Sequence, residues 1–320
     1  DGKRLAWLAE VDGTTQLMVR TLGGGDVTLT TGPTPPLAFR WSPDGQQIAF
    51  TRLVPFASPI RVAAPIPAEG GNWAADPSIA TRLRSGEGWV QLFVVNANGG
   101  EARQVTGGGF DVGARDTGVS GAIPFDWLLD GTAIVFDGLI EPDAERRYQQ
   151  SQLYAVEVAT GTLRRITATD GFWHTPVVSP DGKWIAFSGF GEGTASYRTQ
   201  PLHVIRPDGG GFRTLTAGLD RDAVGATWDP DNQSIWFAAE DRGAINSYSV
   251  SLKDGKVKPG SNGLHRMELA GIARKGGYGV AIRSTTSLPW ELVRFPLKKP
   301  WEIQPVTHLN DALAKAVLAV

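Results

Sequence analysis

A four-residue turn motif recurs along the chain between two short apolar segments. Residues 39–50 read FRWSPDGQQIAF and residues 176–187 read PVVSPDGKWIAF. In such a turn Pro presets the backbone, Asp accepts local hydrogen bonds and Gly adopts positive φ. The apolar segments alternate with period two, so the repeat predicts antiparallel strand pairs and not helical repeats.

Two looser copies of the motif occur at residues 125–136, FDWLLDGTAIVF, and 226–237, ATWDPDNQSIWF. Leu129 replaces Pro in the first of these copies, and Asn232 replaces Gly in the second. Asn is the next-best residue at positive φ, so we expect the same turn in both places.

A second phrase follows the first and predicts a hairpin. It reads QLFVVNANGGEARQVT at 91–106, QLYAVEVATGTLRRIT at 152–167 and PLHVIRPDGGGFRTLT at 201–216, each closing on Thr 15 positions after its first residue. QLMVRTLGGGDVTLTT at 16–31 keeps this spacing, with Thr31 as the closing residue, and the copy at 291–307 is one residue longer. Two hairpins per unit make a four-stranded meander.

Units of ~40–50 residues with four strands are typical of propeller blades. The turn Asp stands at positions 1, 44, 130, 181 and 231, and a degenerate sixth unit covers about 265–308, with strands expected near 268–273, 279–284 and 291–295. We therefore predict an all-β fold, a β-propeller of about six four-stranded blades. Residues 54–88 contain no such phrase, and we interpret them as an insertion between the second and third strands of the second blade. A hidden seventh blade is the alternative.

A blade packs between two neighbours, so both faces of its sheet should be apolar. Equivalent strands carry Ile48, Phe50, Val135, Phe136, Ile185, Phe187, Ile235 and Phe237, and Trp41, Trp127 and Trp228 precede the turns. We interpret these residues as core between blades, with a ligand-stacking surface as the alternative. The first blade starts without its innermost strand. We expect one propeller domain over 1–308, with 309–320 as a linker or ring-closing strand.

Composition excludes several classes of protein. The chain has no Cys, which excludes disulfides and thiolate zinc sites. With 31 basic and 33 acidic residues the net charge is −2, so a broad nucleic-acid-binding face is not expected. No stretch approaches the ~20 apolar residues of a membrane span. Periplasm and cytoplasm both remain open, as does the oligomeric state.

We find no catalytic motif in the sequence. Ser120 follows Gly118 at the GxSxG spacing, but Ala122 stands where the second Gly belongs. His174, His203, His265 and His308 lack metal-ligand spacing and are expected to be packed or solvated. Asp220/Asp222 and Asp229/Asp231 suit turns, with a calcium loop as the alternative. We predict no metal, no cofactor and no catalytic residue in this chain.

Two segments break the repeat and are the candidate binding sites. The insertion carries Arg82 and Arg84, and residues 138–151, GLIEPDAERRYQQS, carry Arg146, Arg147 and Tyr148. Arginines beside an aromatic residue can bind carboxylates or a partner surface. A solvated loop is the alternative interpretation.

The SPDG-x-x-IAF phrase resembles the repeats of the TolB protein and of the propellers in prolyl-oligopeptidase-type serine peptidases. PSIATRLRSGEGWVQLFVVNANGGEARQVT at 77–106 and SLPWELVRFPLKKPWEIQPVTHLN at 287–310 resemble the peptidase propellers more closely. The resemblance implies a C-terminal α/β-hydrolase domain that carries Ser, Asp and His and acts on peptides, with the propeller capping its active site and admitting short substrates. None of those three residues can be placed in this chain.

The chain also lacks the paired-glutamate motif that dipeptidyl peptidases use, which favours an acylaminoacyl-peptidase-like or oligopeptidase-like parent. A self-contained TolB-like propeller that binds a protein partner in the cell envelope is the alternative. A stand-alone propeller enzyme would need polar inner-strand residues, of which Arg40, Asp126 and Glu268 are the main candidates.

Overall fold

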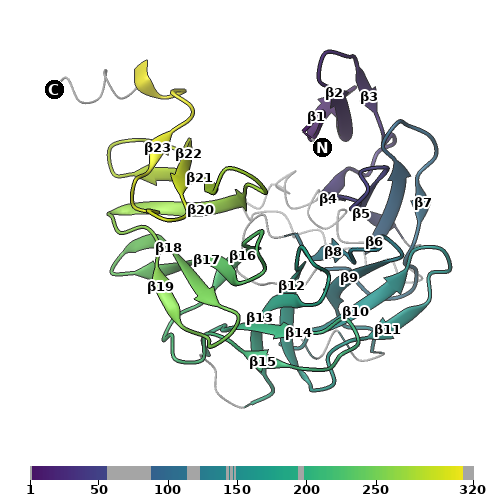
Figure 1. The fold of residues 1–320 in the computed structure, drawn as a ribbon. Coiled ribbons are helices and arrows are strands. Elements are labelled where there is room, and N and C mark those ends of the chain that lie inside the picture. The colour runs from purple at the N-terminus through teal and green to yellow at the C-terminus, as the bar shows by residue number, and fades with distance from the viewer. Residues whose placement is uncertain are drawn as a thin grey trace, which may run out of the picture. The chain divides into compact units, whose positions relative to one another are not determined.

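The computed structural model describes residues 2–55, 88–113, 123–141, 144, 147, 149–193 and 198–312. These residues are almost entirely strands and turns, as the sequence predicts, with a brief helical turn at 311–312. The described strands form six antiparallel meanders in chain order, shown in Figure 1. The chain divides into two compact units, one of residues 1–114 and 140–142, the other of 115–139 and 143–320.

The first unit holds two meanders. The first meander has three strands, β1 (Arg4–Val11), β2 (Thr14–Thr21) and β3 (Asp26–Thr28). The second has four, β4 (Pro36–Trp41), β5 (Gln47–Pro55), β6 (Gly88–Asn96) and β7 (Arg103–Gln104). β5 and β6 pair from Gln47↔Asn96 to Pro55↔Gly88, so Val54, Pro55 and Gly88 are strand residues. The rest of the expected insertion, 56–87, lies outside the described residues.

The second unit holds the other four meanders. The third comprises β8 (Phe125–Trp127), β9 (Ala133–Gly138), β10 (Gln152–Glu157) and β11 (Leu163–Arg165). The fourth comprises β12 (Gly171–Val178), β13 (Ile185–Gly191), β14 (Leu202–Ile205) and β15 (Arg213–Thr214). The fifth comprises β16 (Val224–Trp228), β17 (Ser234–Asp241), β18 (Ala244–Ser251) and β19 (Val257–Pro259). The sixth comprises β20 (His265–Ile272), β21 (Tyr278–Thr285), β22 (Glu291–Pro296) and β23 (Gln304–Pro305), and a parallel pair, Ile245↔Arg266, joins it to the fifth.

The recurrent turns have the predicted geometry. The residue at the fourth position has positive φ in each described copy: 68° at Gly45, 70° at Gly131, 71° at Gly182 and 60° at Asn232. The turn Asp accepts the backbone N–H two residues later, as between Asp44 Oδ1 and Gln46 N at 2.9 Å. Leu129 and Asn232 therefore preserve the turn although they depart from its consensus.

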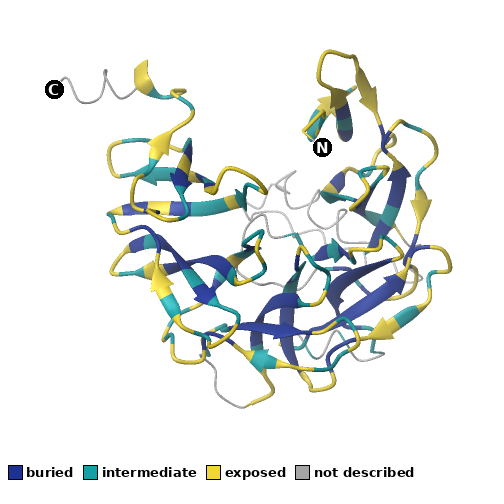
Figure 2. Ribbon diagram, viewed as in Figure 1, coloured by how far each residue is buried: buried dark blue, intermediate teal, exposed yellow. Residues whose placement is uncertain are grey.

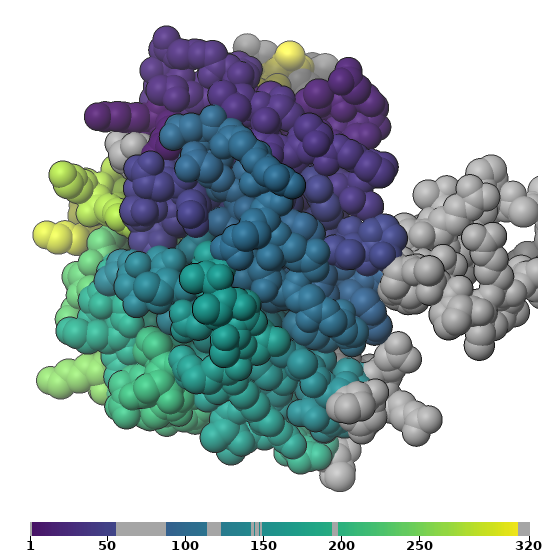
Figure 3. Space-filling view, turned by 90° about the vertical axis from the view of Figure 1, so that its right-hand side faces the viewer, coloured from purple at the N-terminus to yellow at the C-terminus, as the bar shows by residue number. Residues whose placement is uncertain are grey.

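Apolar side chains fill the spaces between neighbouring meanders within each unit. Leu17 and Val19 pack with Ile48 and Phe50 in the first unit. In the second unit one core joins the third and fourth meanders, a second joins the fourth and fifth, and Trp236 packs with Phe295 between the fifth and sixth. The expected aromatic stripe is thus core, and Figure 2 shows burial concentrated on the middle strands. In the space-filling view the second unit forms a continuous surface from teal to green (Figure 3).

A hydroxyl closes every meander, and it is buried in the first five. In the third, Thr167 Oγ1 accepts a hydrogen bond from Leu153 N at 3.2 Å and donates one to Gln152 Oε1 at 2.7 Å. The first meander repeats this arrangement with Thr30, which bonds Leu17 N and Gln16 Oε1, so the expectation that Thr31 closes it was wrong. Thr30 is buried and Thr31 is exposed.

Candidate functional site

Most of the predicted binding residues lie outside the described part of the chain. Arg82 and Arg84 fall within 56–87, and Arg146 and Tyr148 lie in the connection between β9 and β10. Ser120 falls within 114–122, which is also outside. Arg147 is described, so the site is built around it and around the other connections at the same end of the second unit. Ser151 bridges in parallel to Phe172 there, which places the starts of β10 and β12 side by side.

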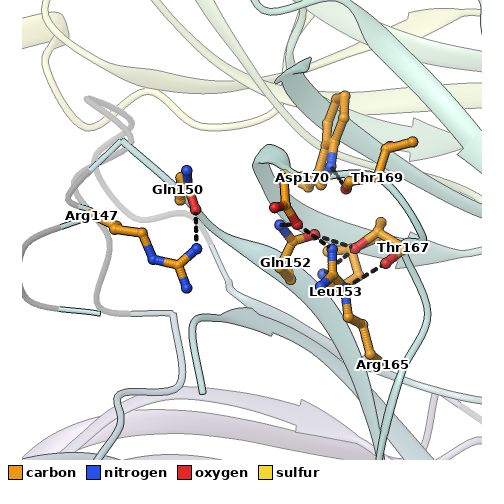
Figure 4. Close-up of polar contacts among 9 residues, drawn as sticks. Arg147, Gln150, Gln152, Leu153, Arg165, Thr167, Thr169 and Asp170 are labelled. Carbon is orange, nitrogen blue, oxygen red and sulfur yellow. Dashed lines mark hydrogen bonds and ion pairs between the residues drawn. The ribbon is translucent and has the colours of Figure 1, made fainter. Parts of the chain in front are cut away.

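Arg147 is half-buried and makes a local contact. Its Nη1 donates to Gln150 Oε1 at 2.8 Å, and the backbone bonds Arg147 N to Ala144 O at 3.1 Å and Gln150 N to Arg147 O at 2.9 Å. Figure 4 draws the Arg147–Gln150 pair apart from the network on Gln152. The described part of this loop therefore presents one arginine whose conformation is set by a turn.

The network beside Arg147 holds the blade together. Gln152 Nε2 donates to Asp170 Oδ1 at 3.3 Å, and Arg165 Nη2 donates to the same oxygen at 2.7 Å (Figure 4). Arg165 Nε also donates to Thr167 O at 2.6 Å. These side chains tie β10 and β11 to the connection that leads into β12, so their polar groups stabilise the fold.

The innermost strand of the fourth meander carries an irregularity at this end. β12 shifts register against β13 between His174 and Val177, and Thr175 between them has a φ of 52°. Positive φ is unfavourable for a β-branched residue. The Thr175 N–H donates at 3.1 Å to Oδ1 of Asp137, a carboxylate that is 1% exposed. Bulges of this kind redirect side chains and are frequent next to functional sites.

His174 lies at the start of the bulge and is 2% exposed. Burial lowers its pKa to about 4, so the ring is neutral near pH 7. Nε2 lies 2.5 Å from Gln200 Oε1, and Nδ1 lies 3.2 Å from Thr175 Oγ1. An amide oxygen only accepts, so Nε2 carries the proton and Nδ1 accepts from the threonine.

Sequence reasoning missed Gln200, Arg198 and the role of Asp222. Gln200 N donates to Asp222 Oδ1 at 2.7 Å, which links the β13–β14 connection to the segment before β16. The Arg198 guanidinium stacks over Phe190 with 4.0 Å between Cζ and the ring centroid. The sequence did contain a signal for Arg198 and Gln200, because residues 192–201 lack the repeat in the same way as residues 138–151.

The other histidines are packed or exposed, as expected. His203 is buried between Gly189 O and Thr214 Oγ1, at 2.9 and 3.0 Å. His265 Nε2 lies 3.2 Å from Ser261 Oγ, which is a Ser–His contact. That hydroxyl is buried and already bonds Ser247 N and Asn246 Oδ1, so it closes the fifth meander and no substrate reaches it. His308 is exposed and lies 3.5 Å from Asp311.

The acidic candidates are engaged in local structure. Asp126 Oδ2 accepts from Val178 N at 2.9 Å, and Glu268 pairs with Arg266 at 3.0 Å. Burial raises the pKa of Asp229, whose Oδ2 lies 3.3 Å from Trp236 Nε1. Within the described ranges no cluster of three or more His, Asp or Glu side chains could hold a metal ion.

Comparison with known proteins places this geometry in context. No protein-family model matches the chain. It is 25% identical to dipeptidyl-peptidase 5 of Porphyromonas gingivalis over 326 residues, covering 98% of this chain and 46% of that protein. An acylaminoacyl peptidase of Pyrococcus horikoshii superposes with a TM-score of 0.68 at 16% identity, over 98% of this chain and 45% of the other. This chain thus spans less than half the length of either protein.

Two further structures decide the fold. The β-propeller domain of the Trilobed protease of Pyrococcus furiosus matches with a TM-score of 0.62 at 16% identity, over 97% of this chain and 79% of that domain. A putative TolB of Agrobacterium tumefaciens matches at 0.56 and 16% identity, over 88% and 84%. The fold is a β-propeller.

The similarity of this propeller extends over nearly its whole length to peptidase propellers and, with a lower TM-score, to a TolB propeller. Both resemblances expected from the SPDG phrase are therefore confirmed. Within the described part of the propeller, no helix is long and apolar enough to cross a membrane.

Proposed function

We propose that this propeller is the non-catalytic part of an acylaminoacyl-peptidase-like or oligopeptidase-like serine peptidase. The proposal rests on how much of each aligned protein the match covers. The match to dipeptidyl-peptidase 5 takes in 98% of this chain but 46% of that protein, and the match to the acylaminoacyl peptidase is divided in the same way. The part of each protein that lies beyond the match is long enough for a hydrolase domain of ~250 residues.

The proposed role is to cap the hydrolase active site and admit short peptides. The β9–β10 and β13–β14 connections of the third and fourth meanders support it, because they carry Arg147 and Arg198 between well-packed strands. Guanidinium groups donate in a fork that matches peptide carbonyl and carboxylate oxygens. Arg82, Arg84, Arg146 and Tyr148 remain proposed members of the same binding surface. We propose six blades, one for each meander.

The test uses the complete gene product. Hydrolysis of a series of acylated peptides from two to about thirty residues should fall steeply beyond a short length. Substituting Arg147→Gln should raise KM for short peptides and leave kcat nearly unchanged, while Arg242→Asn, an exposed cation of the same unit, should change neither. Equal rates of hydrolysis for short and long peptides would refute the proposal that the propeller admits only short substrates. A reading frame that stops near Val320 would favour the TolB-like alternative.

A further inference from the structure

Positive charge gathers at one end of the last two meanders. The β18–β19, β20–β21 and β22–β23 turns, residues 252–256, 273–277 and 297–303, hold six cations. All six are exposed: Lys253, Lys256, Arg274, Lys275, Lys298 and Lys299. We call these six side chains the basic end. The whole chain has a net charge of −2, so this concentration is a local departure from the average.

Strand directions place the three turns at one end of the sheet. In an antiparallel meander the first and third turns share an end, which unites the β20–β21 and β22–β23 turns. β18 runs parallel to β20 through the pair Ile245↔Arg266, so the β18–β19 turn lies at that end too. Figure 1 shows β18 to β23 together. At the opposite end, the connections 260–264 and 286–290 contain no Lys or Arg, and the β17–β18 turn contributes one cation, Arg242.

Local carboxylates neutralise only part of this charge. Glu302 pairs with Lys299 at 3.0 Å, and Asp254 lies in the same turn as Lys256, whose backbone N–H it accepts at 3.2 Å. The β16–β17 turn adds Asp229 and Asp231 at the same end of the fifth meander, so the positive surface is centred on the sixth. There Arg274, Lys275 and Lys298 have no ion-pair partner among the described residues.

An exposed tryptophan lies beside the basic end. Trp301 follows Lys298 and Lys299 in the same turn and is 61% exposed. Tryptophan favours the headgroup level of a bilayer, where its ring is half solvated, and lysines beside it are attracted to anionic lipid. The six exposed cations lie on three separate turns, which suits an extended anionic surface better than a single acidic side chain.

We propose that the basic end docks the protein peripherally on an anionic lipid surface. The basic end is opposite to the end of the sheet at which β22 begins. At that opposite end Glu291 Oε1 accepts the backbone N–H of Asn310 at 2.7 Å. The β9–β10 and β13–β14 connections of the candidate site lie at the end of Asn310, because contacts join the successive meanders there: Ser151 with Phe172, Gln200 with Asp222, and Ile245 with Arg266. Docking therefore leaves the candidate site facing solvent. This inference does not depend on the proposed peptidase role.

The test is sedimentation with vesicles. The protein should bind phosphatidylcholine vesicles that contain about one-third phosphatidylglycerol, should not bind pure phosphatidylcholine, and should dissociate at high salt. Each cation near an anionic surface strengthens binding about fivefold. Arg274→Ser with Lys275→Ser should therefore weaken binding about 25-fold, whereas Arg242→Asn with Arg266→Ser removes equal charge at the opposite end of the sheet and should change it less than twofold.

Trp301→Ser should lower the vesicle binding that remains at intermediate salt, because it removes the apolar contribution of the indole ring to binding and changes no charge. Thermal unfolding confirms that each variant is folded. Failure to bind anionic vesicles, equal binding to neutral ones, or equal loss in both double variants would overturn the proposal. Binding to poly-glutamate but not to vesicles would also overturn it, in favour of an acidic protein partner.

Discussion

The Asp181 backbone N–H donates a hydrogen bond to Asn232 Oδ1 at 3.0 Å, which joins the turns of the fourth and fifth meanders. Asn232 has a φ of 60°, the value that glycine provides in the other copies. The departure from the repeat thus adds a contact that glycine could not make. Leu129, the other departure, lies against Gly182, where an added Cβ would be 2.8 Å from Leu129 Cβ.

Replacing Asn232 tests this contact. Asn232→Gly keeps the backbone conformation but removes the acceptor, so unfolding free energy should fall by about 1 kcal/mol. Gly131→Asn is the matched control, because an added Cβ there meets nothing within 4 Å. Urea denaturation of both variants measures the difference. An unchanged Asn232→Gly variant would show that the turn-to-turn bond contributes nothing.

The closing hydroxyls provide a second prediction. Thr30→Val preserves shape but leaves Leu17 N and Gln16 Oε1 without their buried partner, and should cost about 2 kcal/mol. Thr31→Val, one residue along and exposed, should cost less than about 0.5 kcal/mol. Chemical denaturation of the two variants compares them directly. Equal losses would contradict the assignment of Thr30 as the closing residue.

Burial of His174 predicts acid sensitivity. Its folded pKa is about 4, below the usual 6.5, so the unfolded chain takes up the proton first. The contribution of the neutral His174 ring to the free energy of unfolding is therefore fully present above pH 6.5 and is lost as the pH falls toward 4. The loss amounts to about 2 kcal/mol at pH 4.5. His203 and His265, whose pKa values burial also lowers, act in the same direction.

Denaturation of His174→Gln at pH 7 and pH 4.5 isolates this term. The variant should be less stable than the wild type at pH 7, because the ring is packed, but should lose about 2 kcal/mol less on acidification. If the free energy of unfolding of His174→Gln depends on pH as steeply as that of the wild type, the buried neutral histidine is not the source of the acid sensitivity.

The strained bulge residue offers a gain of stability. Asn tolerates positive φ better than a β-branched residue does, so Thr175→Asn should raise unfolding free energy by about 0.5–1 kcal/mol. Thr175→Val keeps the branching, removes the hydroxyl beside His174 Nδ1 and should be destabilising. Thermal unfolding ranks the two. A Thr175→Asn variant less stable than Thr175→Val would refute the strain at this residue.

The regular parts of the fold were predictable because local chemistry determines them. The turns at Gly45 and Gly182 and the strands of the sixth meander follow from residues close in sequence. Thr31 was chosen wrongly because spacing alone does not say which of two adjacent threonines faces inward. Long-range contacts gave no local signal: His174 meets Gln200 across 26 positions, and the bulge at Thr175 follows from the buried Asp137 on another strand.

The proposal that this propeller is the non-catalytic part of a serine peptidase is tested most directly with a fluorophosphonate probe. The complete gene product should be labelled on a serine beyond residue 320, while the chain of residues 1–320 alone should remain unlabelled and should not hydrolyse chromogenic peptide or acyl-peptide substrates. Labelling of any serine within residues 1–320, or a complete product that no probe labels, would contradict it.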